Sequence, residues 1–209
     1  MTEIDQLLAA LSSPDGKERH FAAVRLGFLG PEPAVIEALK KTAREDSQPH
    51  IRGFAVLSLD RLGHQRAANE IRIEMLSSSR EQTVREAATE LGKSGDPRAA
   101  EALLALLSRK PPQAVIGFVF EALANLHDPR ALDALAPYLA DADPFVRALA
   151  AQSLGALGDA RAVPLLKRLT RDSAHAWNED RGPAFSVGDI ARQSLRKLGH
   201  GFAALFELY

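Results

Sequence analysis

Apolar residues recur along the chain with a helical period and not in strict alternation. In the segment DPFVRALAAQSLGALG (143–158) they fall at Phe145, Val146, Leu149, Ala150, Leu154 and Leu157. The next segment, ARAVPLLKRL (160–169), places Val163, Leu166 and Leu169 on one stripe. A spacing of three and four residues predicts amphipathic helices, so these segments predict one helix following directly on another.

This helix pair is one copy of a repeat about 32 residues long, the length typical of helical repeat proteins. Leu154 has equivalents at Leu26, Leu59, Leu91, Leu123 and Leu195. We therefore predict six helix pairs in a single domain, 1–209, and a C-terminal helix that forms a half-repeat. The predicted segments are 3–30, 31–63, 64–95, 96–127, 128–158 and 159–199, followed by the helix at 200–209.

Short sequences join these helices, namely GDPRA (95–99), HDPRA (127–131), GDARA (158–162) and GHQRA (63–67). Glycine ends a helix by adopting a left-handed conformation, aspartate caps the next helix, and proline suits its first turn. The glycine column holds Gly30, Gly63, Gly95, Gly158 and Gly199, with His127 in the fourth copy. We interpret these sequences as structural joints. The arginines of the joints, Arg66, Arg98, Arg130 and Arg161, are predicted to link successive repeats through the capping residues Asp96, Asp128 and Asp159.

The combination VRxxAAxxLGxLG followed by GDxRAVxxL resembles the HEAT-like repeat family, in particular the repeats of phycobilisome (bilin) lyases. The matching residues are Val146, Arg147, Ala150, Ala151, Leu154, Gly158, Asp159, Arg161, Ala162 and Val163. The resemblance implies an all-α fold, a right-handed α-solenoid whose second helices line the concave side. Because such repeats serve scaffolds, adaptors and a few enzymes, it implies little about function.

One column of the second helices carries large apolar residues. It contains Phe21, Phe54, Glu86, Phe118, Leu149 and Ile190, with Phe28 and Phe145 in neighbouring columns. Exposed, these side chains would form a partner-binding groove; turned inward, they would complete the core. As candidate binding residues we take Phe21, Phe28, Phe54, Phe118, Phe145 and Leu149. The column of Ala156 carries three cations, Arg61, Lys93 and Lys197, which we interpret as a solvated rim.

The last connection is about ten residues longer than the others and contains HAWNEDRGPAFS (175–186). Long loops in compact repeats are often functional. His175, Trp177 and Arg181 are therefore a candidate contact loop, because tryptophan and arginine are common interface anchors. The alternative is that Trp177 folds back on its own repeat.

Composition excludes several kinds of chemistry. The chain has no cysteine, so disulfides, thiolate metal sites and a cysteine nucleophile are absent. Its six histidines form no HxxxH, HExxH or His-Glu pattern, and we predict no metal, no cofactor and no catalytic residue. The start, MTEIDQLLAALSS, is not typical of a signal peptide, and no apolar run is long enough for a membrane span, so we expect a cytoplasmic protein.

These observations predict a non-catalytic adaptor that binds a protein or peptide on the concave face of its second helices. An alternative is a subunit like those of bilin lyases, in which the solenoid holds a tetrapyrrole and its apoprotein for attachment. Nucleic-acid binding is the weakest alternative, because 26 basic and 27 acidic residues leave no positive surplus.

Overall fold

Helices form wherever the sequence shows the helical period. The computed structural model describes residues 1–176 and 185–199, which contain twelve α-helices and two short 3-10 helices. The chain divides into two compact units, residues 1–79 and 80–209. The predicted third repeat is divided between them, because its first helix belongs to the first unit and its second helix to the second. The single-domain boundary 1–209 stays a prediction.

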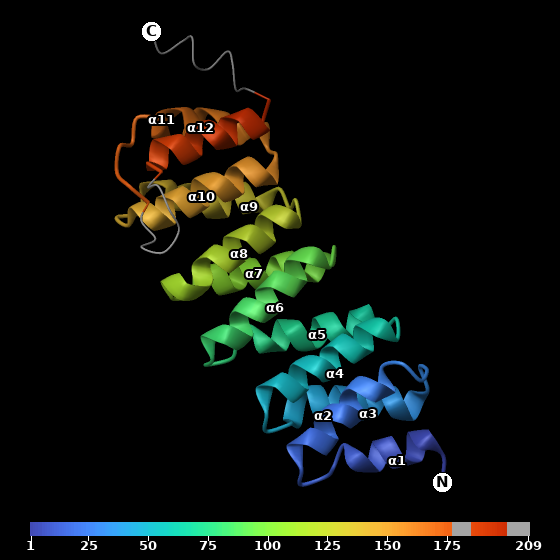
Figure 1. Cartoon of the computed structure of the whole chain (residues 1–209). Helices are drawn as coiled ribbons and strands as arrows, with labels where there is room; N and C mark the ends of the chain where they lie inside the picture. The colour runs from blue at the N-terminus through green and yellow to red at the C-terminus, as the bar shows by residue number, and fades with distance from the viewer. Residues whose placement is uncertain (177–184, 200–209) are drawn as a thin grey trace. The chain divides into compact units, whose positions relative to one another are not determined.

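The first unit contains two complete helix pairs and one further helix (Figure 1). Its helices are α1 (Glu3–Ala10), α2 (Gly16–Leu26), α3 (Pro33–Glu45), α4 (Pro49–Arg61) and α5 (Gln65–Met75). Helix α1 packs on α2, α3 packs on α4, and α4 packs on both α2 and α5. The core between them is filled by fully buried aliphatic side chains such as Leu26, Leu39, Ile51 and Leu59.

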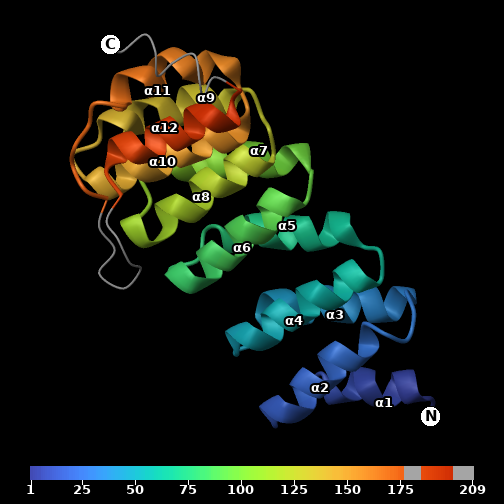
Figure 2. The same cartoon turned by 45° about the horizontal axis from the view of Figure 1, so that its top comes forward.

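The second unit begins with a second helix of a pair and continues through three complete pairs. Its elements are α6 (Glu81–Lys93), α7 (Pro97–Ser108), α8 (Gln113–Asn125), α9 (Arg130–Leu135), η1 (Ala136–Ala140), α10 (Pro144–Leu157), η2 (Ala160–Ala162), α11 (Val163–Leu169) and α12 (Val187–Lys197). The second helices α6, α8, α10 and α12 pack in succession. Figures 1 and 2 show α8, α10 and α12 side by side, with α9 and α11 on the other side of this layer.

The predicted all-α fold of repeated helix pairs is confirmed. Each of the six predicted segments contains one helix pair, and the leucine column (Leu26, Leu59, Leu91, Leu123, Leu154, Leu195) is buried throughout. In the fifth and sixth pairs a 3-10 turn interrupts the first helix, close to Pro137 and Pro164. Proline has no N–H to donate and clashes with the preceding turn, which accounts for these breaks. The C-terminal helix predicted at 200–209 lies outside the described residues.

Neighbouring second helices approach closely at small residues. At three such contacts, a Cβ atom added to a glycine would lie 2.5–2.6 Å from a residue of the neighbouring second helix. These contacts are Gly27 against Ser58, Gly92 against Ala122, and Gly155 against Ser194. Such distances are closer than any ordinary contact, so only glycine fits. Ser58 also donates a hydrogen bond to the carbonyl of Ala23 at 2.8 Å, which satisfies its buried hydroxyl. Small residues therefore set the spacing between repeats in both units.

The joints have the predicted construction. Asp96 and Asp159 cap the following helices by accepting from the amides of Arg98 and Arg161 at 2.9 Å. All five glycines of the column have a positive φ, and so does His127, at 50°. A histidine in this left-handed conformation is uncommon. It is held there by a 3.0 Å contact between its Nδ1 and the carbonyl oxygen of Leu157 in the next joint.

The arginines of the joints behave differently from the prediction. Arg98, Arg130 and Arg161 each form a salt bridge with the aspartate two residues earlier, in their own joint, at 2.6–2.7 Å. Arg161 also donates to the carbonyl of Pro129 in the preceding joint at 3.1 Å. Arg66 pairs with Glu70 on its own helix. For these ion pairs, the predicted links between successive repeats are wrong. Each arginine pairs with the aspartate two residues earlier, which it reaches without crossing to another repeat.

Candidate protein-binding surface

None of the six candidate binding residues lies in the buried core. Phe21 and Phe28 are 63% and 64% exposed, and Phe118 is 38% exposed. The other three, Phe54, Phe145 and Leu149, are half-buried. In a globular protein phenylalanine is usually an interior residue, so two phenylalanines left nearly two-thirds exposed, on α2 and in the turn that follows it, are informative. Phe21 and Phe28 therefore do not complete the core, whereas Phe54, Phe145 and Leu149 are partly covered by their neighbours. The predicted binding role itself stays a prediction.

Three members of the column, Phe54, Phe118 and Leu149, contact the second helix of the preceding repeat. The ring of Phe54 on α4 packs edge-on against His20 of α2, with 4.5 Å between ring centroids. In the second unit, the guanidinium of Arg85 on α6 lies 5.5 Å from the ring centre of Phe118 on α8. Leu149 on α10 lies close to Gly117 on α8. The side chain at the column position of each of these helices therefore packs against the residue that directly precedes the column position on the neighbouring second helix.

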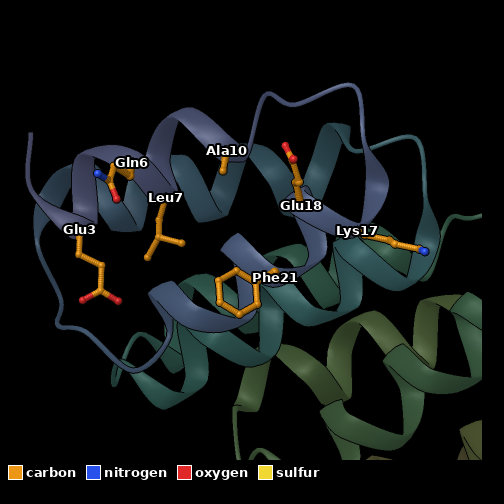
Figure 3. A pocket seen from close by; sticks show the side chains of 7 residues that line it. All are labelled: Glu3, Gln6, Leu7, Ala10, Lys17, Glu18 and Phe21. Carbon is orange, nitrogen blue, oxygen red and sulfur yellow. The ribbon is translucent and has the colours of Figure 1, made fainter.

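Phe21 occupies this column on α2 and lies beside an open groove of about 510 Å³ (Figure 3). Leu7 and Ala10 of α1 form the apolar side of the groove, and Glu3 and Lys17 lie toward its opposite ends. Glu3 is bound at 2.9 Å by Arg25 of α2. The groove is thus apolar in the middle and charged at both ends, an arrangement typical of protein contact surfaces.

The exposed face of the two second helices in the first unit repeats at an offset of 33 residues. We call this set the unit 1 stripe: Lys17, Phe21 and Val24 on α2 with Phe28 in the turn that follows it, and His50, Phe54, Leu57 and Arg61 on α4. The guanidinium of Arg61 lies 4.7 Å from the centre of the Phe28 ring, a cation–π contact between the two helices. Leu57 is exposed and was missed by the sequence analysis, although its equivalence to Val24 is visible in the repeat.

The second unit has a different set at the equivalent positions. The unit 2 stripes are Gln82, Glu86, Thr89 and Lys93 on α6; Ala114, Phe118, Glu121 and Asn125 on α8; Phe145, Leu149, Gln152 and Ala156 on α10; and Ser186, Ile190, Gln193 and Lys197 on α12. Two carboxylates, Glu86 and Glu121, are exposed on this face. The apolar character predicted for the whole column is therefore concentrated in the first unit and, in the second, on α8 and α10.

Two buried ion pairs fix the turns that carry these helices, and both were missed by the sequence analysis. Arg19 of α2 pairs with Asp46 at 2.7 Å, and Arg147 of α10 pairs with Asp172 at 2.8 Å. Each arginine also donates to a carbonyl in the turn before its own helix, that of Ser13 or Asp141. The hydrogen bonds from the arginines lower the pKa values of Asp46 and Asp172. The recurrence of arginine at the positions of Arg19 and Arg147 was a signal visible in the sequence. Their aspartate partners, 25 to 27 residues away, gave no such signal.

Of the candidate contact loop, only His175 lies within the described residues; Trp177 and Arg181 do not. His175 is exposed and pairs with Ser186 in an isolated antiparallel bridge. The amide of Ala176 donates to the carbonyl of Phe185 at 3.2 Å, and the amide of Val187 to that of Ala174 at 2.9 Å. The two ends of the insert are therefore held together directly before α12, and Phe185 is exposed beside them. A contact role for this loop stays a prediction.

Within residues 1–176 and 185–199, no three histidine or acidic side chains lie close enough to hold a metal ion. His20 and His50 are near one another, with ring centroids 5.9 Å apart, in a hollow that Lys17 and Gln48 also line. No described helix has the length and apolar character needed to cross a bilayer. The predicted cytoplasmic location stays a prediction.

Comparison with known families agrees with this architecture. The profile of the HEAT repeats family matches residues 4–90 and 100–179. The chain belongs to the HEAT-repeat family. A second profile, that of the PBS lyase HEAT-like repeat, matches residues 84–109, which cover most of α6 and all of α7. The resemblance noted in the sequence is thus confirmed.

Solved structures similar to this HEAT-repeat chain include designed and natural repeat proteins. An engineered protein is 19% identical, with 98% of each chain covered and a TM-score of 0.55. A computationally designed armadillo repeat protein for modular peptide recognition is 20% identical, covering 93% of this chain and 99% of its own, with a TM-score of 0.50. The complex of CpcE and CpcF of phycocyanin lyase from Nostoc sp. PCC7120 is 19% identical over 100% and 96%, with a TM-score of 0.43. A comparison with curated protein sequences found no relative.

Proposed function

We propose that this HEAT-repeat chain is a non-catalytic adaptor that binds a protein or peptide through the exposed face of its second helices. The observation that carries the proposal is the exposure of Phe21, Phe28 and Phe118 on that face. Aromatic side chains dominate the binding energy of protein interfaces because each buries a large apolar area when a partner covers it. Most large apolar side chains of the described residues are buried or half-buried, so the exposed aromatics on this face stand out against them.

The framework also suits binding without rearrangement. Phe21 lies on α2, which is capped by Asp15 and packs closely on α4 at Gly27, and Phe118 lies on α8, which packs closely on α6 at Gly92. A surface that is ordered before binding loses little conformational entropy when a partner docks. The bilin-lyase-like and nucleic-acid alternatives stay predictions, and no contact among the described residues favours either of them.

The test compares single variants in the two units with a matched control. Phe28→Ser and Phe118→Ser each remove one exposed aromatic, and Ala105→Ser changes an exposed position on the first helix α7. Tagged chains capture proteins from the native cell, and the captured proteins are quantified by mass spectrometry. We expect the wild type and Ala105→Ser to retain the same partners, and at least one phenylalanine variant to lose them.

The thermal stability of the variants determines how the capture experiment is interpreted. Substitutions at exposed positions usually change the free energy of unfolding by less than about 0.5 kcal/mol, so all variants should keep the same thermal unfolding midpoint. Equal capture by every variant would contradict the proposal. So would a large drop in the unfolding midpoint, because it would show that these rings support the core.

A further inference from the structure

The unit 1 stripe is a matched pair of rows on neighbouring helices. The four positions of each row follow the spacing i, i+4, i+7 and i+11, which places the row of α4 and the first three residues of the other row on one face of their helices. Phe28 continues the first row in the turn after α2. The helices pack against each other, and the contact between Arg61 and Phe28 joins the two rows. At 1.5 Å per residue each row is about 16 Å long, which is the length of three helical turns.

The stripe carries positive charge, which is clearest at its Arg61 end. Lys17 and Arg61 are exposed, form no ion pair among the described residues, and share the stripe with His50 and no carboxylate. Next to Lys17, Asp15 caps α2 and Glu18 accepts from the hydroxyl of Ser13. The carboxylates close in sequence to His50 and Arg61 are bound elsewhere. Asp46 pairs with Arg19, and Asp60 with Arg72. An arginine held over an aromatic ring remains a full positive charge, so it is available to a carboxylate from outside.

We infer that the unit 1 stripe binds a short acidic segment of a protein, one that carries both apolar side chains and carboxylates. This inference rests on the proposed function and names the chemistry of its partner. The apolar side chains would cover Phe21, Phe28 and Leu57, and the carboxylates would reach Lys17 and Arg61. A nucleic acid fits less well, because most of the stripe is apolar and offers few groups to phosphates.

The unit 2 stripes are less suited to the same segment, because they carry two carboxylates as well as Lys93 and Lys197. Glu86 and Glu121 are exposed there at positions that hold Phe21, Phe54 or Leu57 in the first unit. Like charges across an interface select against a wrong docking site. The acidic segment is therefore expected on the first unit only, although both units have the same repeat framework.

A display library of random peptides about 12 residues long, the length of a row of the stripe, tests the inference without assuming a partner. The full chain is the target, and synthetic copies of the enriched peptides are titrated against it by fluorescence anisotropy. We expect enrichment of aspartate or glutamate together with large apolar residues. Affinity should fall by about tenfold or more in Arg61→Glu and in Phe28→Ser, and should weaken as salt is added.

The matched control is Lys93→Glu, which makes the same charge change at the equivalent position of α6 and should leave affinity unchanged. Thermal unfolding of each variant verifies that it is folded. Peptides that need Phe28 but lack acidic residues, or that ignore Arg61→Glu, would overturn the inference and leave the proposed function standing. Peptides insensitive to both Phe28→Ser and Phe118→Ser, or no enrichment at all, would overturn both. A fluorescent single-stranded oligonucleotide that displaces the peptide from the wild type, and not from Arg61→Glu, would reassign the stripe to nucleic acid.

Discussion

The exposed faces of the second helices differ between the two units, whereas the contacts behind them are the same. In the first unit the face is aromatic, aliphatic and cationic; in the second it is mostly polar and includes Glu86 and Glu121. A repeat contacts only its neighbours, so the outward positions take no part in stacking and are free to differ from copy to copy. We therefore expect partner binding to depend on the side chains exposed in one unit, and not on the repeat framework that both units share.

The shared contacts show how little the framework depends on that face. Arg19 with Asp46 in the first unit matches Arg147 with Asp172 in the second. The close approach of Gly27 to Ser58 matches that of Gly92 to Ala122. Substitutions in the framework should therefore change stability in either unit, and substitutions on the face should change binding.

The largest effect is expected from one substitution made at two glycines. In Gly92→Ala the new methyl group would lie 2.6 Å from the Cα of Ala122, so α6 and α8 must move apart. We expect a loss of about 3 kcal/mol in the free energy of unfolding, because a packed interface yields poorly to an added carbon. In Gly53→Ala, on α4, the methyl group meets nothing within 4 Å. There we expect a gain of about 0.5–1 kcal/mol, since alanine favours a helix interior.

Urea unfolding followed by circular dichroism measures both values. The two variants have the same composition, so their comparison cancels effects of the added methyl group on the unfolded chain. Equal changes in the two units would show that the spacing between second helices is not set by these small residues.

The parts of this fold that were predictable from sequence are the local ones. Helical period, aspartate caps and left-handed glycines each depend on a few consecutive residues, and the repeat shows them several times. Even His127 was placed in the glycine column, where its φ is positive. The leucine column was found for the same reason, because a buried position recurs once per repeat.

Contacts between residues far apart in sequence were not predictable. The partner of Arg19 lies 27 residues away in a turn with no motif of its own, and the joint arginines were assigned to neighbouring repeats when their nearest carboxylate is local. For the candidate surface, the repeat in the sequence identified the column but left open which way it faces. A rotation of the helix by a fraction of a turn decides that, and only packing fixes it.

An intermediate effect is expected at the two buried ion pairs. Asp46 is the more buried of the two aspartates, with 3% of its side chain exposed against 20% for Asp172. Replacing either by asparagine removes a charge-assisted hydrogen bond and leaves an arginine unpaired. We expect Asp46→Asn to cost about 2 kcal/mol and Asp172→Asn about 1 kcal/mol. Urea unfolding of the single variants, and of each double variant with Arg19→Gln or Arg147→Gln, measures the coupling free energy between the arginine and the aspartate of each pair. A larger coupling in the second pair would contradict the order given by burial.

The smallest effect concerns the two capping boxes, one in each unit. Thr2 and Asp5 cap α1, and Ser186 and Asp189 cap α12. The amide and hydroxyl of Thr2 lower the pKa of Asp5, whereas Asp189 accepts from the Ser186 hydroxyl and also from Arg192, which lowers its pKa to about 2. Because this pKa is lower in the folded chain than the unfolded value of about 3.9, the carboxylate stabilises the fold above about pH 4 and stops doing so as pH falls toward about 2.

The difference in unfolding midpoint between the wild type and Asp189→Asn should therefore shrink as pH is lowered from about 5 to about 3. Carboxyl carbon NMR should show Asp189 titrating at a lower pH than Asp5. Arg192→Gln separates the causes, because it removes a contact that Asp189 has and Asp5 lacks. It should raise the pKa of Asp189 toward that of Asp5 and leave Asp5 unchanged. If Asp5 and Asp189 have the same pKa in the wild type, the contact with Arg192 does not lower the pKa of Asp189 relative to that of Asp5.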